Sequence, residues 1–197
     1  ESNALKKYKN VIGIDEVGKG SLFGPVIACC VLLNQEFLSL NMSLIKDSKK
    51  LSEKKRNEFV GKFLLTKCKF GLGFSSNRFI DKTNISFATF EAMRKSIVDL
   101  DNPVDFIFVD GDKKIPNLDC EQFKIIKGDD KCKIIGAASI IAKFIRDFII
   151  RKYDRIFPFY NLYNNVGYGT KEHIENIRKF QRSFLHRNSF KIKSIDR

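Results

Sequence analysis

The chain has 197 residues, and its 36 Lys and Arg residues outnumber its 23 Asp and Glu residues to give a formal net charge of +13. This length suits one domain with a hydrophobic core, so no metal or disulfide is needed merely for folding. With 43% hydrophobic residues, 12 glycines and 4 prolines, the composition excludes a wholly disordered, fibrous or low-complexity chain.

Apolar runs predict three strands and one helix in the first part of the chain. The β-branched run 11–14 and the run 26–33 flank a glycine-rich segment, which indicates two strands joined by a tight connection. Ser52 is typical of an N-cap, and the segment after it has phenylalanines and a leucine on one helical face. Residues 68–74 alternate enough to predict a third strand.

Helices and strands alternate in the second part. A helix capped by Asn84 precedes buried strands at 104–109 and 123–126. A long helix at 134–150 carries small residues that allow close approach to a sheet. A short helix at 171–180 leads into a basic end with scattered aromatic residues.

This order of elements predicts the fold class and the domain organisation. We expect an α/β fold with a mixed five-stranded sheet flanked by helices and a small C-terminal helical and loop extension. A single domain is predicted over residues 10–190, with a basic tail at 191–197. Residues 1–9 are expected to be a flexible N-terminal extension, and we interpret its first residues as a cloning remnant.

Cysteine usage and the apolar runs bear on the compartment. The five cysteines include no Cys-x-x-Cys pair, which argues against a disulfide framework or a zinc site and favours a reducing compartment. The apolar run 25–33 is too short to span a bilayer and follows no cationic leader. The sequence therefore predicts a cytoplasmic protein without a membrane partner, and we expect a monomer.

Acidic residues stand where apolar strands are predicted to end, namely Asp15 and Glu16, Asp110, and Asp129. Because ligand sites of open α/β sheets lie outside strand ends, these carboxylates are expected in one cleft. Carboxylate oxygens are ligands that Mg²⁺ and Mn²⁺ prefer, and two such ions can stabilise both oxygens of a phosphoryl transfer. The alternative is that these acids only form turns, as an Asp-Gly pair often does.

The basic excess points to a polyanion, because lysines and arginines that neutralise phosphates release condensed counterions. A basic surface would hold the backbone of a nucleic acid while an acidic pocket holds metal. A lysine-rich surface also arises from solubility or coding bias, so net charge alone leaves the partner open.

Seven motifs resemble, in the same order, those of the type 2 ribonucleases H, the ribonuclease HII family. They are GIDEVGKGSLFGPV at 13–26, DSKKLS at 47–52, FVDG at 108–111, KGD at 127–129, AASIIAK with RD at 137–147, GYGTKEH at 167–173 and HRNSF at 186–190. Because they extend over nearly the whole chain, the resemblance implies a ribonuclease H-like fold for all of it.

The resemblance implies a metal-dependent endonuclease. Such an enzyme hydrolyses the RNA strand of RNA–DNA hybrids and incises 5′ of ribonucleotides embedded in duplex DNA, leaving 5′-phosphate and 3′-hydroxyl ends, and so removes primer RNA and single ribonucleotides. The metal-binding and catalytic carboxylates of the family correspond to Asp15, Glu16, Asp110 and Asp129, which are the acids found at predicted strand ends. Two Mn²⁺ or Mg²⁺ ions are expected to activate a water for in-line attack on the phosphorus.

The resemblance also implies where the substrate binds. The glycine-flanked basic residue that contacts the RNA–DNA junction corresponds to Gly18-Lys19-Gly20, and the tyrosine that stacks there corresponds to Tyr168. Glycines let main-chain amides approach a sugar-phosphate closely, and only the 2′-hydroxyl distinguishes ribose from deoxyribose. From the residues alone, a tight turn and a packing tyrosine remain alternatives.

Basic residues of the other motifs are candidates for phosphate contacts. They are Lys49, Lys50, Lys143, His173, His186 and Arg187, of which Lys50 is favoured first. Lys143 can equally extend from a buried helix, and His186 can satisfy a hydrogen bond in the core. We interpret Asp147, next to Arg146, as a structural partner of a helix or loop and not as a metal ligand.

Two positions depart from the family pattern. Lys19 stands where an arginine is usual, and Ser21 where a proline is usual. A lysine is a point charge and not a bidentate fork, so contacts at the junction are expected to be rearranged. A lysine here also suggests ribonuclease HIII, but that family carries an extra N-terminal domain and only about ten residues precede the first predicted strand.

Two other classes of function fit the sequence less well than the endonuclease. A catalytically inactive hybrid-binding module would keep only the basic surface, and the presence of all the carboxylates argues against it. A structural or ribosome-associated basic protein gives no reason for a glycine-flanked lysine beside paired acids.

Overall fold

A computed structural model describes residues 1–33, 37, 45, 51–66 and 68–196 of the chain. Its strands are β1 (Val11–Val17), β2 (Val26–Leu32), β3 (Lys69–Ser75), β4 (Phe106–Asp110) and β5 (Glu121–Ile125). They form a five-stranded sheet in the order β3-β2-β1-β4-β5. The β1–β2 and β2–β3 pairs are antiparallel and the β1–β4 and β4–β5 pairs are parallel, which confirms the predicted mixed sheet.

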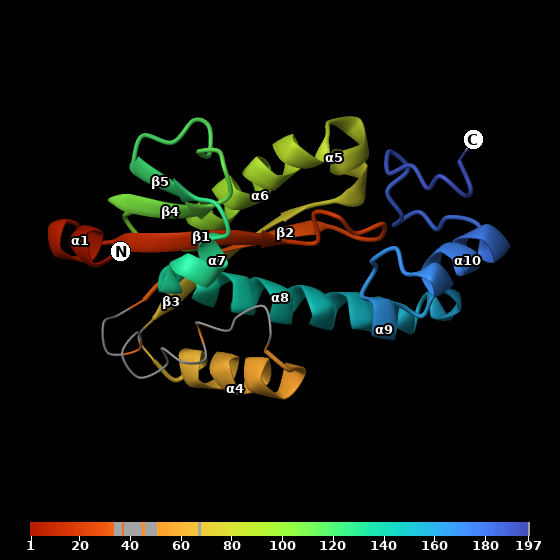
Figure 1. The fold of residues 1–197 in the computed structure, drawn as a ribbon, viewed down its shortest axis with the longest axis horizontal. Coiled ribbons are helices and arrows are strands. Elements are labelled where there is room, and N and C mark those ends of the chain that lie inside the picture. The colour runs from red at the N-terminus through yellow and green to blue at the C-terminus, as the bar shows by residue number, and fades with distance from the viewer. Residues whose placement is uncertain (34–36, 38–44, 46–50, 67, 197) are drawn as a thin grey trace.

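Helices cover both faces of the sheet (Figure 1). The helical segments are α1 (Ser2–Lys7), α4 (Glu53–Leu64), α5 (Asn77–Lys82), α6 (Ile85–Asp99), α7 (Gly128–Lys131), α8 (Lys133–Asp154), the 3-10 helix η2 (Pro158–Tyr160), α9 (Leu162–Asn165) and α10 (Lys171–Phe180). Helices α8 and α4 lie on one side and α6 and α5 on the other, while α9 and α10 lie at the far end of α8 (Figure 1). None of the described helices is long and apolar enough to cross a membrane.

Side chains alternate between two cores because successive residues of a strand point to opposite faces. Val11 and Cys29 pack on the α8 side. Ile12 and Ile14 pack on the α6 side. A third cluster around Phe23 joins the C-terminal segments to the end of α8.

The predicted helix caps are present. Ser52 accepts a hydrogen bond from Lys55 N (3.4 Å) at the start of α4, and Asn84 accepts one from Phe87 N (2.9 Å) at the start of α6. Each cap satisfies a main-chain N–H that has no partner within the helix.

Two of the predicted acid positions differ from the structure. Strand β1 does not end before Asp15 but continues through it, because β2 runs antiparallel beside it and pairs Cys29 with Asp15. Asp129 does not end a strand but lies in the short helix α7, which follows a left-handed residue, Lys127 (φ 55°). Only Asp110 is the last residue of its strand.

The structure also differs from the flexible N-terminal extension that we expected at residues 1–9. Residues Ser2–Lys7 form α1, and the Tyr8 ring stacks on Phe106 with ring centroids 4.9 Å apart. The Glu1 carboxylate accepts a hydrogen bond from Ile134 N (3.1 Å) in the first turn of α8, where main-chain N–H groups are otherwise unpaired. The basic tail also packs, because Ile192 is buried.

Glycines on β3 allow α6 to lie close against the sheet. A Cβ atom on Gly73 would lie 1.8 Å from the carbonyl oxygen of Ala92, which is main chain and cannot rotate away. Gly61 in α4 is the contrasting case, since a Cβ there would meet nothing within 4 Å.

We expect Gly73→Ala to lower the free energy of unfolding by about 1–3 kcal/mol, because α6 must move away from β3. Gly61→Ala is the matched control, and it should raise that free energy by about 0.5–1 kcal/mol through helix propensity. Urea unfolding of both variants measures the difference. Equal effects of the two substitutions would contradict the close packing of α6 on β3.

Two buried histidines hold the C-terminal extension together. His173 Nδ1 lies 2.8 Å from Tyr168 O, and Ser183 N donates to His186 Nδ1 (2.9 Å). These partners assign the proton of His173 to Nδ1, so the 3.2 Å contact between the two Nε2 atoms is a hydrogen bond donated by His186. Burial, then the charges of His173 and Arg182, lower the pKa of His186 to about 3.

Acid should therefore destabilise the fold in a defined range. In the unfolded chain His186 binds a proton near pH 6.5, whereas in the folded chain it does so only near pH 3. The free energy of unfolding should therefore fall as the pH drops below about 6.5, by up to about 1.4 kcal/mol per pH unit. His186→Asn keeps an acceptor for Ser183 N, and we expect it to reduce this slope. Urea unfolding between about pH 7 and 4.5 tests it, and an unchanged slope would show that His186 does not contribute.

Candidate active site

Strand β1 places two acids on opposite faces of the sheet. Asp15 is 5% exposed, and the nearby Ser139 hydroxyl of α8 favours its charged form. Glu16, one residue further along, points to the other face and lines a cavity together with Thr89 of α6. The Glu16 main-chain N–H donates to Asp15 Oδ1 (2.7 Å), which fixes the first carboxylate.

A hydrogen bond joins the end of β4 to α7. Asp110 Oδ1 accepts from Gly128 N at 2.6 Å, and a side chain on Gly128 would collide with Ile135. Because Asp129 follows Gly128 directly, this bond brings the buried Asp129 beside the end of β4. The segment after β5, and not the end of a strand, therefore places Asp129 near Asp110.

The acids act on one another electrostatically. Burial raises the pKa of Asp15 well above its usual range, and the charges of Glu16 and Asp110 raise it further. Burial raises the pKa of Glu16, Lys19 opposes that shift, and Asp110 adds to it. Such a cluster of ionised oxygens is stabilised when a cation binds.

The donor set therefore fits a hard divalent cation, for which carboxylate oxygens are the preferred ligands. Among the described residues, no group of three or more His, Cys, Asp and Glu side chains is gathered closely enough in this structure to hold a metal ion. The cation present at the cluster is the Lys19 ammonium, 3.1 Å from Glu16 Oε1. A cavity of about 120 Å³ beside Glu16 and Asp110 leaves room for a ligand.

The Gly18-Lys19-Gly20 segment forms a tight turn directly after β1. Gly18 has a φ of +86°, and a Cβ there would lie 2.2 Å from Arg146 Nε, so both backbone and space require glycine. Ser21 N donates to Gly18 O (3.2 Å) and closes the turn. Lys19 and Gly20 are exposed.

Main-chain hydrogen bonds hold the loop that carries Tyr168 against the residues that follow this turn. Leu22 N and Phe23 N both donate to Gly167 O, at 2.9 and 3.2 Å. The Tyr168 ring is half-buried, and the Arg146 guanidinium carbon lies 5.2 Å from the ring centroid. The two motifs that the sequence assigned to the substrate junction thus lie side by side.

Ser21 and Arg146 are functional positions whose roles the sequence did not reveal. Arg146 donates to Val166 O (2.8 Å) and to the Ser21 hydroxyl (2.6 Å), and the latter lies 2.9 Å from Gly167 O. The serine that replaces the usual proline therefore bonds the turn to the Tyr168 loop. Ser139 was also missed, because a lone hydroxyl in a helix carries no sequence signal of what it contacts.

The predicted phosphate-binding residues have different surroundings. Lys49 and Lys50 lie outside the described residues. Lys143 donates to both oxygens of Asp147, at 3.0 and 2.8 Å, and its side chain is 39% exposed. His173 and His186 are buried in the pair described above.

Arg187 does not lie where a direct phosphate contact needs it. Its side chain is fully buried, and its guanidinium donates to main-chain oxygens of Lys19 and Gly24. The prediction that Arg187 contacts a substrate phosphate directly is therefore corrected, because the C-terminal segment buries this side chain.

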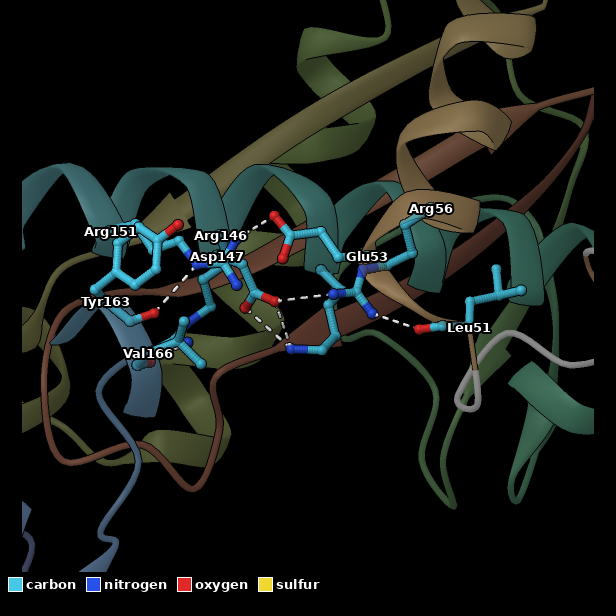
Figure 2. Close-up of polar contacts among 9 residues, drawn as sticks. Leu51, Glu53, Arg56, Arg146, Asp147, Arg151, Tyr163 and Val166 are labelled. Atoms are coloured by element: carbon cyan, nitrogen blue, oxygen red, sulfur yellow. Dashed lines mark hydrogen bonds and ion pairs between the residues drawn. The ribbon is translucent and has the colours of Figure 1, made fainter. Parts of the chain in front are cut away.

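Asp147 is the structural partner that we predicted. Figure 2 shows its side chain reaching from α8 toward α4, where Arg56 Nη2 lies 3.6 Å from its Oδ2 atom and Arg56 Nη1 donates to Leu51 O. Arg151 pairs with Glu53 in the same network (Figure 2). A neighbouring cavity of about 500 Å³ is lined by these residues and contains none of the predicted metal ligands.

Comparisons with known proteins agree with this geometry. The sequence pattern of the family described as Ribonuclease HII matches residues 12–193. The chain is 41% identical over 180 residues to the Ribonuclease HII of Caldanaerobacter subterraneus subsp. tengcongensis, covering 91% of this chain and 73% of that protein.

Solved structures show the same fold. The ribonuclease in the PCNA:RNase HII complex from Archaeoglobus fulgidus is 25% identical, with a TM-score of 0.78 over 93% of this chain and 96% of that chain. Bst-RNase HIII in complex with Mn²⁺, 17% identical, has a TM-score of 0.70 over 92% of this chain and 67% of that chain and shares the fold. The chain belongs to the ribonuclease HII family, and it is a metal-dependent endonuclease of the ribonuclease H class, which acts on RNA–DNA hybrids.

Proposed function

We propose that this chain incises 5′ of ribonucleotides embedded in duplex DNA as well as cutting the RNA strand of hybrids, leaving 5′-phosphate and 3′-hydroxyl ends. The observation that carries this proposal is the placement of Asp15 and Glu16 near the end of β1, directly before a glycine turn with exposed residues, and of Asp110 at the end of the neighbouring parallel strand β4. The acids suit phosphodiester hydrolysis, and the turn suits close contact with a sugar-phosphate backbone.

Four carboxylates would hold the cations, namely Asp15, Glu16, Asp110 and Asp129. Two Mg²⁺ or Mn²⁺ ions bound there would supply an activated water and neutralise charge on the scissile phosphate. The Glu16 N–H orients the Asp15 carboxylate, and Gly128 N orients that of Asp110. The protein thus fixes its ligands through neighbouring hydrogen bonds.

The substrate would lie across the Gly18-Lys19-Gly20 turn and Tyr168. Lys19 pairs with Glu16 in this structure, so its ammonium lies at the border between the acids and the turn. The Tyr168 ring offers a stacking surface for a sugar or base. Lys50 and Lys143 are proposed to contact phosphates further along the backbone, and the chain is proposed to act as a monomer.

Asp110→Asn should lower the rate of cutting a duplex with a single ribonucleotide by at least about a hundredfold, because the charge that binds the cation is lost. Asparagine keeps the acceptor for Gly128 N, so the fold should persist. Asp99→Asn is the matched control, because Asp99 also accepts a main-chain N–H, from Leu72 (2.8 Å). Gel assays with Mg²⁺ or Mn²⁺ measure both variants. An inactive wild type, or an Asp110→Asn variant that cuts as well as the wild type, would refute the proposed site.

Tyr168→Ala should reduce cutting at a single ribonucleotide by about tenfold or more, since stacking on an aromatic ring contributes about 1–3 kcal/mol. Cutting of a long hybrid should fall less, because many ribonucleotides offer alternative contacts. Tyr163→Ala is the control, because this exposed ring also packs against an arginine, Arg151, at 5.1 Å. Equal losses on both substrates would count against a role of Tyr168 at the junction.

A further inference from the structure

Arg187 lies beneath the Gly18-Lys19-Gly20 turn and holds its main chain. Nη1 donates to Lys19 O and Nε donates to Gly24 O, both at 3.0 Å. The planar guanidinium thus joins the two ends of the connection between β1 and β2. Arg187 N also donates to Leu22 O (2.9 Å), so side chain and main chain fix the same segment.

This contact sets the direction of one peptide group. No peptide bond is cis in the described part of the chain, so the C=O of Lys19 and the N–H of Gly20 point in opposite directions. Arg187 draws the carbonyl inward, and the Gly20 N–H is therefore directed outward. Gly20 is exposed, its N–H has no acceptor within the described residues, and a Cβ there would meet nothing within 4 Å.

The stability of the fold does not by itself explain why an arginine is buried at position 187. Its side chain is fully buried, and it takes part in none of the ion pairs found among the described residues. Asp81, whose charge acts on it, accepts hydrogen bonds from the main chain of Asn188 and Ser189. A buried charge without a carboxylate partner is commonly no more stabilising than an apolar side chain of similar size. What Arg187 supplies is the geometry of two hydrogen bonds.

We propose that Arg187 is a positioning residue for ribonucleotide recognition, which holds the Lys19–Gly20 peptide so that the Gly20 N–H donates to the 2′-hydroxyl oxygen at the cleavage junction. The inference rests on the proposed function. Arg187 itself does not touch the substrate. A lysine at this position would keep the charge, but its single nitrogen cannot take the place of a fork that spans the carbonyls of Lys19 and Gly24.

The test compares two DNA duplexes that differ by one ribonucleotide, bound without divalent cations so that no cutting occurs. Wild type should prefer the duplex with the ribonucleotide, and Arg187→Lys should reduce that preference by about tenfold, the effect of one hydrogen bond, with little change for all-DNA duplex. Arg182→Lys is the matched control. Arg182 donates to Arg187 O and Phe190 O in the same segment but does not contact residues 18–25.

Each outcome has a distinct meaning. If wild type does not prefer the ribonucleotide, the proposed function fails. If wild type does and Arg187→Lys keeps the preference, or if Arg182→Lys loses it equally, the role of Arg187 fails while the proposed function stands.

A measurement on wild type covers the case in which Arg187→Lys does not fold. Amide hydrogen exchange at Gly20 should be fast in the free protein and slowed by the duplex with a ribonucleotide, but not by the all-DNA duplex. Equal protection by both duplexes, or protection by neither, would overturn the inference.

Discussion

Helix α8 lies so close to strand β1 that a methyl side chain on Gly13 would not fit between them. A Cβ atom on Gly13 would lie 2.5 Å from the carbonyl carbon of Ile134, and both are main chain or fixed to it. This close approach determines where the later residues of α8 lie. Ser139 reaches Asp15, Arg146 reaches the turn after β1, and Asp147 faces α4. A single helix, α8, therefore fixes how the carboxylates lie relative to the turn after β1. The same helix fixes the position of α4.

The positive and negative charges of the site are kept apart by their hydrogen-bond partners. Arg146 and Arg187 are fully buried, yet their described partners are carbonyl oxygens and the Ser21 hydroxyl, with no carboxylate among them. The acids Asp15 and Asp110 accept hydrogen bonds from main-chain N–H groups, and no arginine pairs with them among the described residues. Direct pairing of these arginines with the acids would have neutralised the ligands that a cation needs.

Much of the fold followed from local patterns, and the exceptions have physical causes. The caps Ser52 and Asn84 were predictable because a cap acts on its own helix within three residues. The end of β1 was not predictable from local patterns, since the length of this strand depends on how far β2 continues beside it. The place of Asp129 depended on a left-handed residue and a short helix, neither of which has a hydrophobic period. Helix α1 forms because Tyr8 and Glu1 dock on distant segments, which no local pattern encodes.

The sequence by itself determined the order of the strands and longer helices along the chain, the family and the identity of the candidate carboxylates, because apolar periodicity and motif chemistry are local properties. Tertiary structure alone decided which groups those residues meet. Arg187 reads as one of many exposed cations in a basic chain, and only the folding of the C-terminal segment over the turn shows that it is buried against Lys19 O. Ser21 reads as a departure from a pattern, and only its contacts with Gly167 and Arg146 show what it does. Burial and long-range hydrogen bonds join residues far apart in the chain, so they are fixed only when all the layers pack together.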